Sequence, residues 1–391
     1  MIDTAVFNSV ATPCYLFDID ALRDHTQALR RRFGQKSHIC YAMKANPFIV
    51  SALADIVDTF EVCSPGEFRI CEAQKIDPKQ ILVSGVYKNA KDLERYVSVY
   101  GSDLTYSVES LSQWEMLSHL AMRYHCSLKV YLRLSSKNQF GMDQQDIEWI
   151  VKHRHESVYL SIEGLHYFSG TQKTASGKYM KEFLKLKTLM VLLNDEYGLK
   201  DLRLEYGPGL PVDYYNREVE GAHELVESLS EAIDASGFTG MITLEMGRYI
   251  SAYCGYYVTA VVDTKKVNAE NYAIVDGGIH QVTYYGQTLG LKQPLHFVMN
   301  SGSELRSWTV FGALCTINDI LLRQVELPDL VLGSRLVFER AGSYSVTEGI
   351  ALFLSRDLPV VYSYQSGQGL RCLRDVIETD QLNCAVPIKE R

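Results

Sequence analysis

The stretch Tyr41-Ala42-Met43-Lys44-Ala45-Asn46-Pro47 follows the apolar run at residues 38–42, which is typical of a short buried strand. Asn46-Pro47 favours the end of regular structure or the start of a helix. Lys44 is therefore expected at the end of a buried strand, where its ammonium would lose water. Desolvation lowers the pKa of a lysine and supplies the free amine that imine formation requires. On this stretch alone, an ordinary hydrated lysine at a strand end is the commoner case.

Short apolar or β-branched runs alternate with stretches of helical periodicity on the C-terminal side of this segment. Together with the run that precedes Lys44, the strand candidates are residues 37–42, 59–62, 81–84, 104–107, 127–134, 160–166, 202–206 and 241–245. The helical stretches are residues 48–57, 65–74, 89–98, 108–124, 143–154, 176–196 and 217–236. This alternation indicates parallel strands joined by helices. Eight such strands predict an α/β fold with a TIM-like (β/α)8 barrel.

The two ends of the chain differ from this pattern. Residues 13–18 form an apolar extended run, and Asp20 is expected to cap a helix that ends at Phe33. After about residue 250, apolar runs follow one another with turns and few helices, which predicts a β-rich second domain. Four such runs are residues 256–262, 272–275, 308–311 and 336–338. The predicted domains are an N-terminal strand that packs with the β domain (1–24), the barrel (25–250) and the C-terminal β domain (251–391).

The composition restricts the partners and the compartment. A net charge of −8 and an isoelectric point near 5.7 argue against a nucleic-acid partner. The sequence has no run of 18 apolar residues, and residues 1–5 lack the pattern of a signal peptide, so we expect neither a membrane span nor export. The nine cysteines form no CxxC pair, which favours reduced thiols in a cytoplasmic protein and offers no metal-binding motif.

Chemically informative residues fall where the predicted barrel strands end, which is where barrels of this type place their active sites. These are Lys44, Glu61, His166, Gly207-Pro208-Gly209 and Glu245-Met246-Gly247-Arg248. Taken singly, each has an ordinary explanation, such as a turn or a surface corner. Together they suit pyridoxal 5′-phosphate (PLP). Glycine turns and an arginine bind phosphate, a lysine forms the imine, and Glu245 would keep the ring nitrogen protonated.

Five motifs, in order along the chain, carry a family resemblance. They are residues 41–46, Phe60-Glu61-Val62-Cys63-Ser64-Pro65-Gly66-Glu67, residues 245–248, Gly312-Ala313-Leu314-Cys315-Thr316-Ile317-Asn318-Asp319 and Ala341-Gly342-Ser343-Tyr344. The chain resembles the fold-type III PLP enzymes, in particular the diaminopimelate/ornithine/arginine decarboxylase group. The resemblance implies the fold of that class, which alanine racemase shares, and a homodimer with shared active sites.

The resemblance also implies roles for single residues. Lys44 would hold the cofactor as an imine until the substrate amine displaces it. Cys315 would reach the partner subunit's site and return a proton to the carbanion, with Asp319 near the substrate amine. Tyr344 would approach the cofactor phosphate. We also expect Glu61 to contact the cofactor and His166 to contact the substrate.

Three departures from the family pattern are informative. Where the family stacks a histidine on the cofactor ring, the segment His166-Tyr167-Phe168-Ser169-Gly170-Thr171 offers Phe168, with Thr171 for the phosphate. The usual Gly-Gly-Gly turn is Gly207-Pro208-Gly209, and because proline has no N–H, the N–H groups of Gly209 and Leu210 remain as donors. After Asp276-Gly277-Gly278 the diaminopimelate enzymes have an arginine for the far carboxylate. This chain has none through Gln287, which argues against free diaminopimelate as the substrate.

The last stretch and the His-x-Phe-x-Gly segment are similar to a branch of decarboxylases from secondary metabolism. These act on an aminoacyl group tethered to a carrier protein, as in butirosin-type pathways, or on citryl-diamine intermediates of siderophore pathways. A carrier protein is usually acidic and would need a local basic patch. The helix at residues 181–187 is one candidate, although an ordinary solvated helix face explains it equally well.

We therefore predict a PLP-dependent α-decarboxylase of an amino acid or an amino-acid-derived substrate, free or carrier-tethered, in a biosynthetic pathway. Three alternatives stay open. One is a diaminopimelate- or ornithine-type decarboxylase of a free amino acid. Another is an amino-acid racemase, against which Glu245 speaks because racemases of this fold place arginine at the ring nitrogen. The third is a non-catalytic PLP-binding homologue, which would not need to retain together Lys44, Glu245, Arg248, Cys315 and Asp319.

Overall fold

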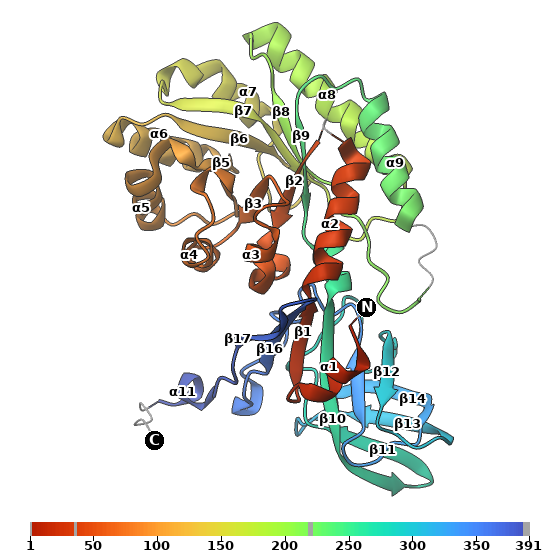
Figure 1. Ribbon diagram of the computed structural model, residues 1–391. Helices are drawn as coiled ribbons and strands as arrows, with labels where there is room; N and C mark the ends of the chain where they lie inside the picture. The colour runs from red at the N-terminus through yellow and green to blue at the C-terminus, as the bar shows by residue number, and fades with distance from the viewer. Residues whose placement is uncertain (1, 35–36, 218–221, 386–391) are drawn as a thin grey trace. The chain divides into compact units, whose positions relative to one another are not determined.

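The computed structural model describes residues 2–34, 37–217 and 222–385 (Figure 1). The chain divides into two compact units. The first comprises Met1–Asp24, Asp213–Val219 and Ile250–Arg391. The second comprises His25–Val212 and Glu220–Tyr249. We call the second the barrel unit and the first the β unit.

The barrel unit contains a closed barrel of parallel strands in which β9 pairs with β2. The strands are β2 (Ser37–Ala42), β3 (Thr59–Val62), β4 (Ile81–Val83), β5 (Thr105–Val108), β6 (Leu128–Leu134), β7 (Leu160–Phe168), β8 (Arg203–Gly207) and β9 (Ile242–Met246). The eight predicted strands are confirmed, each within two residues of its expected bounds. Their short apolar runs are buried on both faces, as parallel strands covered by helices require.

The helices of the barrel unit lie between the strands (Figure 1). They are α2 (Ile19–Phe33, which begins in the β unit), α3 (Val50–Leu53), α4 (Pro65–Ala73), α5 (Ala90–Tyr100), α6 (Leu111–Tyr124), α7 (Gln144–His153), α8 (Gly177–Tyr197), α9 (Ala222–Ala235) and α10 (Arg248–Ser251). The predicted cap of α2 is wrong. Oδ1 of Asp18 accepts a hydrogen bond from the N–H of Ala21 at 2.9 Å, so Asp20 lies inside the first turn.

The β unit is built on one mixed sheet, and the predicted β-rich domain is confirmed. Its elements are α1 (Thr4–Ser9), β1 (Cys14–Asp18), β10 (Gly255–Val267), β11 (Glu270–Val275), β12 (His296–Met299), β13 (Leu305–Phe311), β14 (Ile320–Pro328), β15 (Arg335–Phe338), β16 (Val360–Gln365), β17 (Gly369–Arg374) and α11 (Asp380–Asn383). Strand β1 lies between β10, to which it is antiparallel, and β16, to which it is parallel. In the core of the β unit, Leu16 of β1 and Phe7 of α1 pack against Val258 and Val337.

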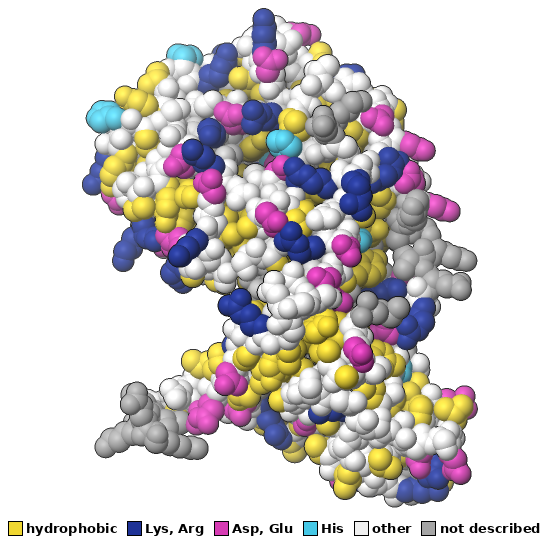
Figure 2. All heavy atoms as spheres, in the orientation of Figure 1, with side chains coloured by type: hydrophobic (Ala, Val, Ile, Leu, Met, Phe, Trp, Pro, Cys, Tyr) yellow, Lys and Arg dark blue, Asp and Glu magenta, His cyan; other side chains and the backbone are white. Residues whose placement is uncertain are grey.

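None of the helices in the described ranges is both long and apolar enough to cross a membrane. Figure 2 shows basic and acidic side chains interspersed over one face of the molecule.

Candidate active site

Lys44 lies in the 3-10 turn formed by Met43–Ala45, which directly follows β2. Its Nζ lies 2.6 Å from Oε2 of Glu61 and 3.9 Å from Oε1 of Glu245. The two carboxylates are almost buried, with side chains 1% and 6% exposed, whereas the lysine side chain is 41% exposed. The expected desolvation of Lys44 is therefore wrong. Two neighbouring carboxylates and solvent both stabilise its ammonium form.

A close backbone approach holds β9 against the Lys44 turn. A Cβ atom at Gly247 would lie 2.9 Å from the carbonyl oxygen of Ala42 and 2.9 Å from Cβ of Ala45, so only glycine fits there without displacement. The turn itself is ended by Asn46, whose side chain accepts a hydrogen bond from the N–H of Phe48 at 3.0 Å. These local features bring the ends of β2 and β9, and with them Lys44 and Glu245, together.

The side chain of His166 on β7 lies next to that of Glu245. Its ring is completely buried, with Nδ1 2.8 Å from Oγ of Ser107 and Nε2 3.0 Å from Oε2 of Glu245. Burial, and then the positive charge of Arg133, hold the pKa of His166 well below its usual range, so the ring is neutral at pH 7. The side chain of His166 is completely buried in this structure, and its contact with a substrate stays a prediction.

The approach of His166 to Glu245 lacks hydrogen-bond geometry. Oε2 of Glu245 is a buried acceptor with no hydrogen-bond partner among the described residues. An unsatisfied buried carboxylate oxygen is costly unless a ligand supplies a donor.

A buried ion pair lies at the carboxyl ends of β5 and β6. Nη1 of Arg133 on β6 lies 3.0 Å from Oε1 of Glu109, and the two side chains are 5% and 2% exposed. Nearby, Nζ of Lys88 donates to the carbonyl oxygen of Gly85 at 2.6 Å and to Oε1 of Gln113 at 3.0 Å. Burial lowers the pKa of Lys88 to about 8. The sequence reasoning missed these residues.

Glu205 of β8 is a second buried carboxyl group that the sequence reasoning missed. Burial, and then the charge of Glu245, raise the pKa of Glu205 well above its usual range, so its carboxyl group holds a proton. A charged residue between apolar neighbours in a predicted strand is the signal that could have found both Glu205 and Arg133. The two carboxyl groups of β8 and β9 therefore differ in their surroundings.

The loops after β7 and β8 meet at Gly209. Its φ is +64°, and a Cβ atom there would lie 2.1 Å from the carbonyl oxygen of Gly170. The ring of Phe168 packs on Gly207, where a Cβ atom would lie 2.5 Å from Cδ2 of the ring. Thr171 is exposed on the same loop. The structure thus brings the predicted residues Phe168, Thr171, Gly207 and Gly209 together.

Arg248 follows Gly247 as the first residue of α10 and is half-buried. It therefore directly follows the end of β9, the strand that contains Glu245. Its position is compatible with the predicted phosphate contact.

Three predicted residues belong to the β unit. Cys315 is exposed and has a free thiol. Asp319 is 1% exposed, and its two oxygens accept hydrogen bonds from the N–H groups of Ile279 and Leu314, both at 2.8 Å. Asp319 thus fixes the loop that contains Cys315, which differs from the predicted contact with a substrate amine. Tyr344 has a φ of +63°, the left-handed conformation, which is uncommon for a residue other than glycine.

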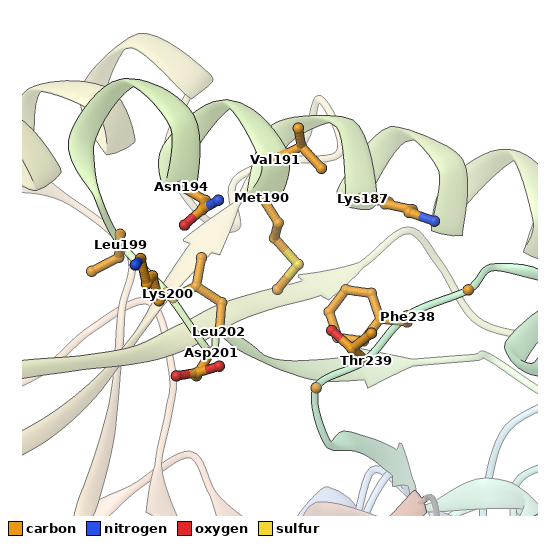
Figure 3. A pocket seen from close by; sticks show the side chains of 12 residues that line it. Lys187, Met190, Val191, Asn194, Leu199, Lys200, Asp201, Leu202, Phe238 and Thr239 are labelled. Carbon is orange, nitrogen blue, oxygen red and sulfur yellow. The ribbon is translucent and has the colours of Figure 1, made fainter.

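A pocket of about 550 Å³ lies elsewhere on the barrel unit (Figure 3). It is lined by α8 and by the segments 199–202 and 237–240, which precede β8 and β9. It therefore lies at the amino ends of these strands. Barrel active sites lie at the carboxyl ends, so this pocket is not the candidate site.

An amine between two carboxylates at the carboxyl ends of barrel strands defines the site of a (β/α)8 enzyme that can bind a carbonyl cofactor. Residues 19–252 match the family model of the pyridoxal-dependent decarboxylases, pyridoxal binding domain, and the chain belongs to this family. It is a PLP-dependent decarboxylase, as the relatives below also indicate.

The chain is similar to three curated enzymes over most of their lengths. It is 25% identical to the L-glutamyl-[BtrI acyl-carrier protein] decarboxylase of Niallia circulans, over 93% of this chain and 91% of that enzyme. It is 26% identical to the diaminopimelate decarboxylase of Helicobacter pylori strain J99, over 87% of each chain. It is 27% identical to the 2-[(L-alanin-3-ylcarbamoyl)methyl]-2-hydroxybutanedioate decarboxylase of Staphylococcus aureus, over 88% and 92%.

A solved structure shows the same fold. The crystal structure of diaminopimelate decarboxylase from Helicobacter pylori complexed with L-lysine matches with a TM-score of 0.84 at 24% identity, over 97% of this chain and 98% of that chain.

Proposed function

We propose that this enzyme removes the α-carboxyl group of an aminoacyl substrate at the site formed by Lys44, Glu61, His166 and Glu245. The observation that supports this site best is the position of the Lys44 amine, 2.6 Å from one buried carboxylate and 3.9 Å from another. PLP bound there supplies an electron sink for the pair of electrons left on Cα when CO2 departs. The residues fit this cofactor, because Glu245 has an unsatisfied buried acceptor for a ring N–H.

The residues that would hold the cofactor divide by function. Lys44 would bind the aldehyde, Glu245 the ring nitrogen and Phe168 the ring face. The phosphate would be bound by Thr171, Gly207, Gly209, Gly247 and Arg248. Because His166 is neutral, it lies beside the Glu245 carboxylate without opposing its charge. Glu245 would thus be available for the ring nitrogen.

Glu61 holds the Lys44 amine in place. The hydrogen bond from Nζ of Lys44 to Oε2 of Glu61 is 2.6 Å long, and the Glu61 side chain is 1% exposed. A buried carboxylate at this distance would fix the position of the amine that binds the cofactor aldehyde.

The homodimer with shared sites remains a proposal. Cys315 is exposed on a loop that Asp319 holds in place, so its thiol is accessible to a partner subunit. In such a dimer Cys315 would give its proton to Cα after CO2 has left. The free thiols are compatible with a cytoplasmic, biosynthetic enzyme.

We favour a carrier-tethered aminoacyl group as the substrate, and a free amino acid is the second candidate. One similar enzyme acts on a glutamyl group of an acyl-carrier protein, whereas another is a diaminopimelate decarboxylase. The segment after Gly278 contains no arginine for a far carboxylate, and Tyr284 donates its hydroxyl to the carbonyl oxygen of Glu339 instead. A tethered substrate has its second carboxyl group blocked and needs no such arginine.

The test is CO2 release by the PLP-loaded full chain from a panel of free amino acids and of aminoacyl groups loaded on a phosphopantetheinylated carrier protein. Release from loaded carriers but not from the free acids would support the proposal. Mirror-image amino acid without CO2, formed in deuterated buffer, would indicate a racemase instead. Lys44→Ala is the control and should lose both turnover and the cofactor absorbance near about 420 nm. An unchanged spectrum would falsify the role of Lys44.

A further inference from the structure

A second buried ion pair lies outside the site described above. Lys173, in the loop after β7, and Glu182, on α8, approach to 2.8 Å between Nζ and Oε2. Their side chains are 4% and 13% exposed. Burial lowers the pKa of Lys173, and the hydrogen bond to Glu182 opposes this shift. A buried ion pair rarely stabilises a fold more than apolar side chains of similar volume would, which points to a role of this pair in positioning other residues.

Glu182 connects three elements of the barrel unit. Its Oε1 accepts a hydrogen bond from the hydroxyl of Ser169 at 2.6 Å, in the loop after β7. Its Oε2 accepts from the hydroxyl of Tyr206 on β8 at 2.5 Å, in addition to Lys173. Nζ of Lys173 also lies 5.3 Å from the ring centre of Tyr206. One carboxylate thus fixes the loop after β7, the helix and the strand that leads into Gly207.

Further hydrogen bonds connect the loop after β7 with the segment after β8. The N–H of Lys173 donates to the carbonyl oxygen of Gly209 at 2.9 Å. The side-chain amide of Gln172 binds Val212 twice, donating to its carbonyl oxygen at 3.0 Å and accepting from its N–H at 2.7 Å. Residues 169–173 and 207–212, which we call the two phosphate loops, are therefore tied together along their length.

These bonds determine the direction of the donors that remain in the turn. In a trans peptide the C=O and the following N–H point in opposite directions. Since the carbonyl of Gly209 faces Lys173, the N–H of Leu210 faces away from the loop at 169–173. Pro208 offers no N–H. The loss of one donor makes the orientation of the others more important.

We propose that Lys173 and Glu182 are positioning residues that hold the two phosphate loops in the geometry that binds the cofactor phosphate. The proposal rests on the proposed binding of that phosphate at Thr171, Gly207 and Gly209. Both side chains are almost entirely buried and satisfied by one another, so they act through the backbone and not by touching the phosphate. They set how tightly PLP is retained.

The test compares two ligands that differ only in the phosphate. Apoenzyme of the full chain is titrated with PLP and with pyridoxal, and binding is followed by cofactor absorbance. The variants are Glu182→Gln, Lys173→Met and the double variant, with Ser169→Ala as a milder change. Arg95→Met is the matched control, because it removes a half-exposed cation that pairs with Glu72 on the barrel surface.

We expect Glu182→Gln and Lys173→Met to weaken PLP binding by about 10- to 100-fold, the usual effect of groups that orient direct ligands. Ser169→Ala should give a smaller loss in the same direction. Pyridoxal binding should be unchanged in all variants, and Arg95→Met should change neither ligand. A role in general folding would weaken both ligands equally.

Two outcomes overturn the proposal. They are an equal loss of affinity for PLP and pyridoxal, and unchanged PLP affinity in every variant, including Ser169→Ala if the ion-pair variants fail to fold. Failure of the proposed function has a different signature. In that case the unmodified chain itself would bind no PLP, or would bind PLP as well after Lys44→Ala.

Discussion

The two units differ in how many charged side chains they bury. Among the described residues, the buried Asp, Glu, Lys, Arg and His side chains of the barrel unit are Glu61, Lys88, Glu109, Arg133, His166, Lys173 and Glu205. Those of the β unit are Asp18, His280 and Asp319. Both units also bury tyrosines, and three of those in the β unit have hydroxyls that donate to a single acceptor. Tyr15 and Tyr257 both donate to Gln281, and Tyr284 donates to Glu339.

We attribute this difference to the candidate active site, which lies in the barrel unit. Buried charges cost stability unless they are paired, and hydrophobic side chains of similar volume often serve a fold equally well. The barrel unit keeps several charges near the ends of its strands, where Lys44 and Glu245 lie, whereas the described part of the β unit buries three. The predictions below test whether the barrel charges are paired, whether they act in chemistry, and whether a buried histidine of the β unit and a buried carboxyl group of the barrel unit respond oppositely to pH.

The largest effect is expected from Arg133→Met. Because this change leaves the carboxylate of Glu109 buried without its charge partner, we expect a loss of about 3–5 kcal/mol in the free energy of unfolding. Urea unfolding of the full chain measures it. The double variant Arg133→Met/Glu109→Gln removes both charges and should regain most of the loss. If single and double variants lost the same free energy, the charge pairing of the barrel unit would not explain its stability.

The next prediction contrasts the carboxyl groups of β8 and β9. Glu245→Gln should lower kcat by about 10²–10³-fold, because the ring nitrogen would lose the charge that keeps it protonated. Glu205→Gln should change kcat only a few-fold, because its carboxyl group is already neutral and the amide has the same shape. Steady-state CO2 release measures both. Equal losses would mean that the charge of Glu245 is not the feature that matters.

The sequence predicted the parts of this molecule that depend on pattern. The alternation of strands and helices predicted all eight barrel strands. Because Lys44 and Glu245 lie at the ends of predicted strands, the sequence also placed the two residues in one candidate site. The four runs predicted after residue 250 did not include β12, β14, β16 or β17. β12 is only half-buried and the first four residues of β17 are exposed, whereas β14 and β16 were missed although they contain buried residues. A strand without a buried face gives no periodic signal.

Burial of charge was not predicted, although Arg133 and Glu205 each stand between apolar neighbours in a predicted strand. Arg133, Lys173 and Glu205 are residue types that are usually exposed, and their partners come from other elements. The exposure of Lys44 was predicted wrongly for a related reason. A buried strand does not determine whether the residue beyond its end faces the protein interior or the open end of the barrel. The roles of Cys315 and Tyr344 followed only from family resemblance.

The remaining predictions concern pH, and His280 and Glu205 should change the stability of the chain with opposite sign. Burial, and then the charge of Arg356, lower the pKa of His280 in the β unit from 6.5 to about 4. Between these values the unfolded chain binds a proton that the folded chain does not, so stability is lost as the pH falls through this window. Glu205 in the barrel unit has a raised pKa. The folded chain keeps its proton above pH 4.5 while the unfolded chain releases it, so stability is lost as the pH rises.

Urea unfolding from about pH 4 to about pH 9 separates the two contributions, each at most about 1.4 kcal/mol per pH unit. His280→Gln should flatten the acid limb of the stability profile and leave the alkaline limb unchanged, because it removes the group that the unfolded state protonates. Glu205→Gln should do the reverse, stabilising the chain increasingly above pH 4.5. If either substitution shifted the whole profile by a constant amount, its side chain would contribute through packing and not through a proton. The contrast between a neutral base in the β unit and a neutral acid in the barrel unit would then fail at that residue.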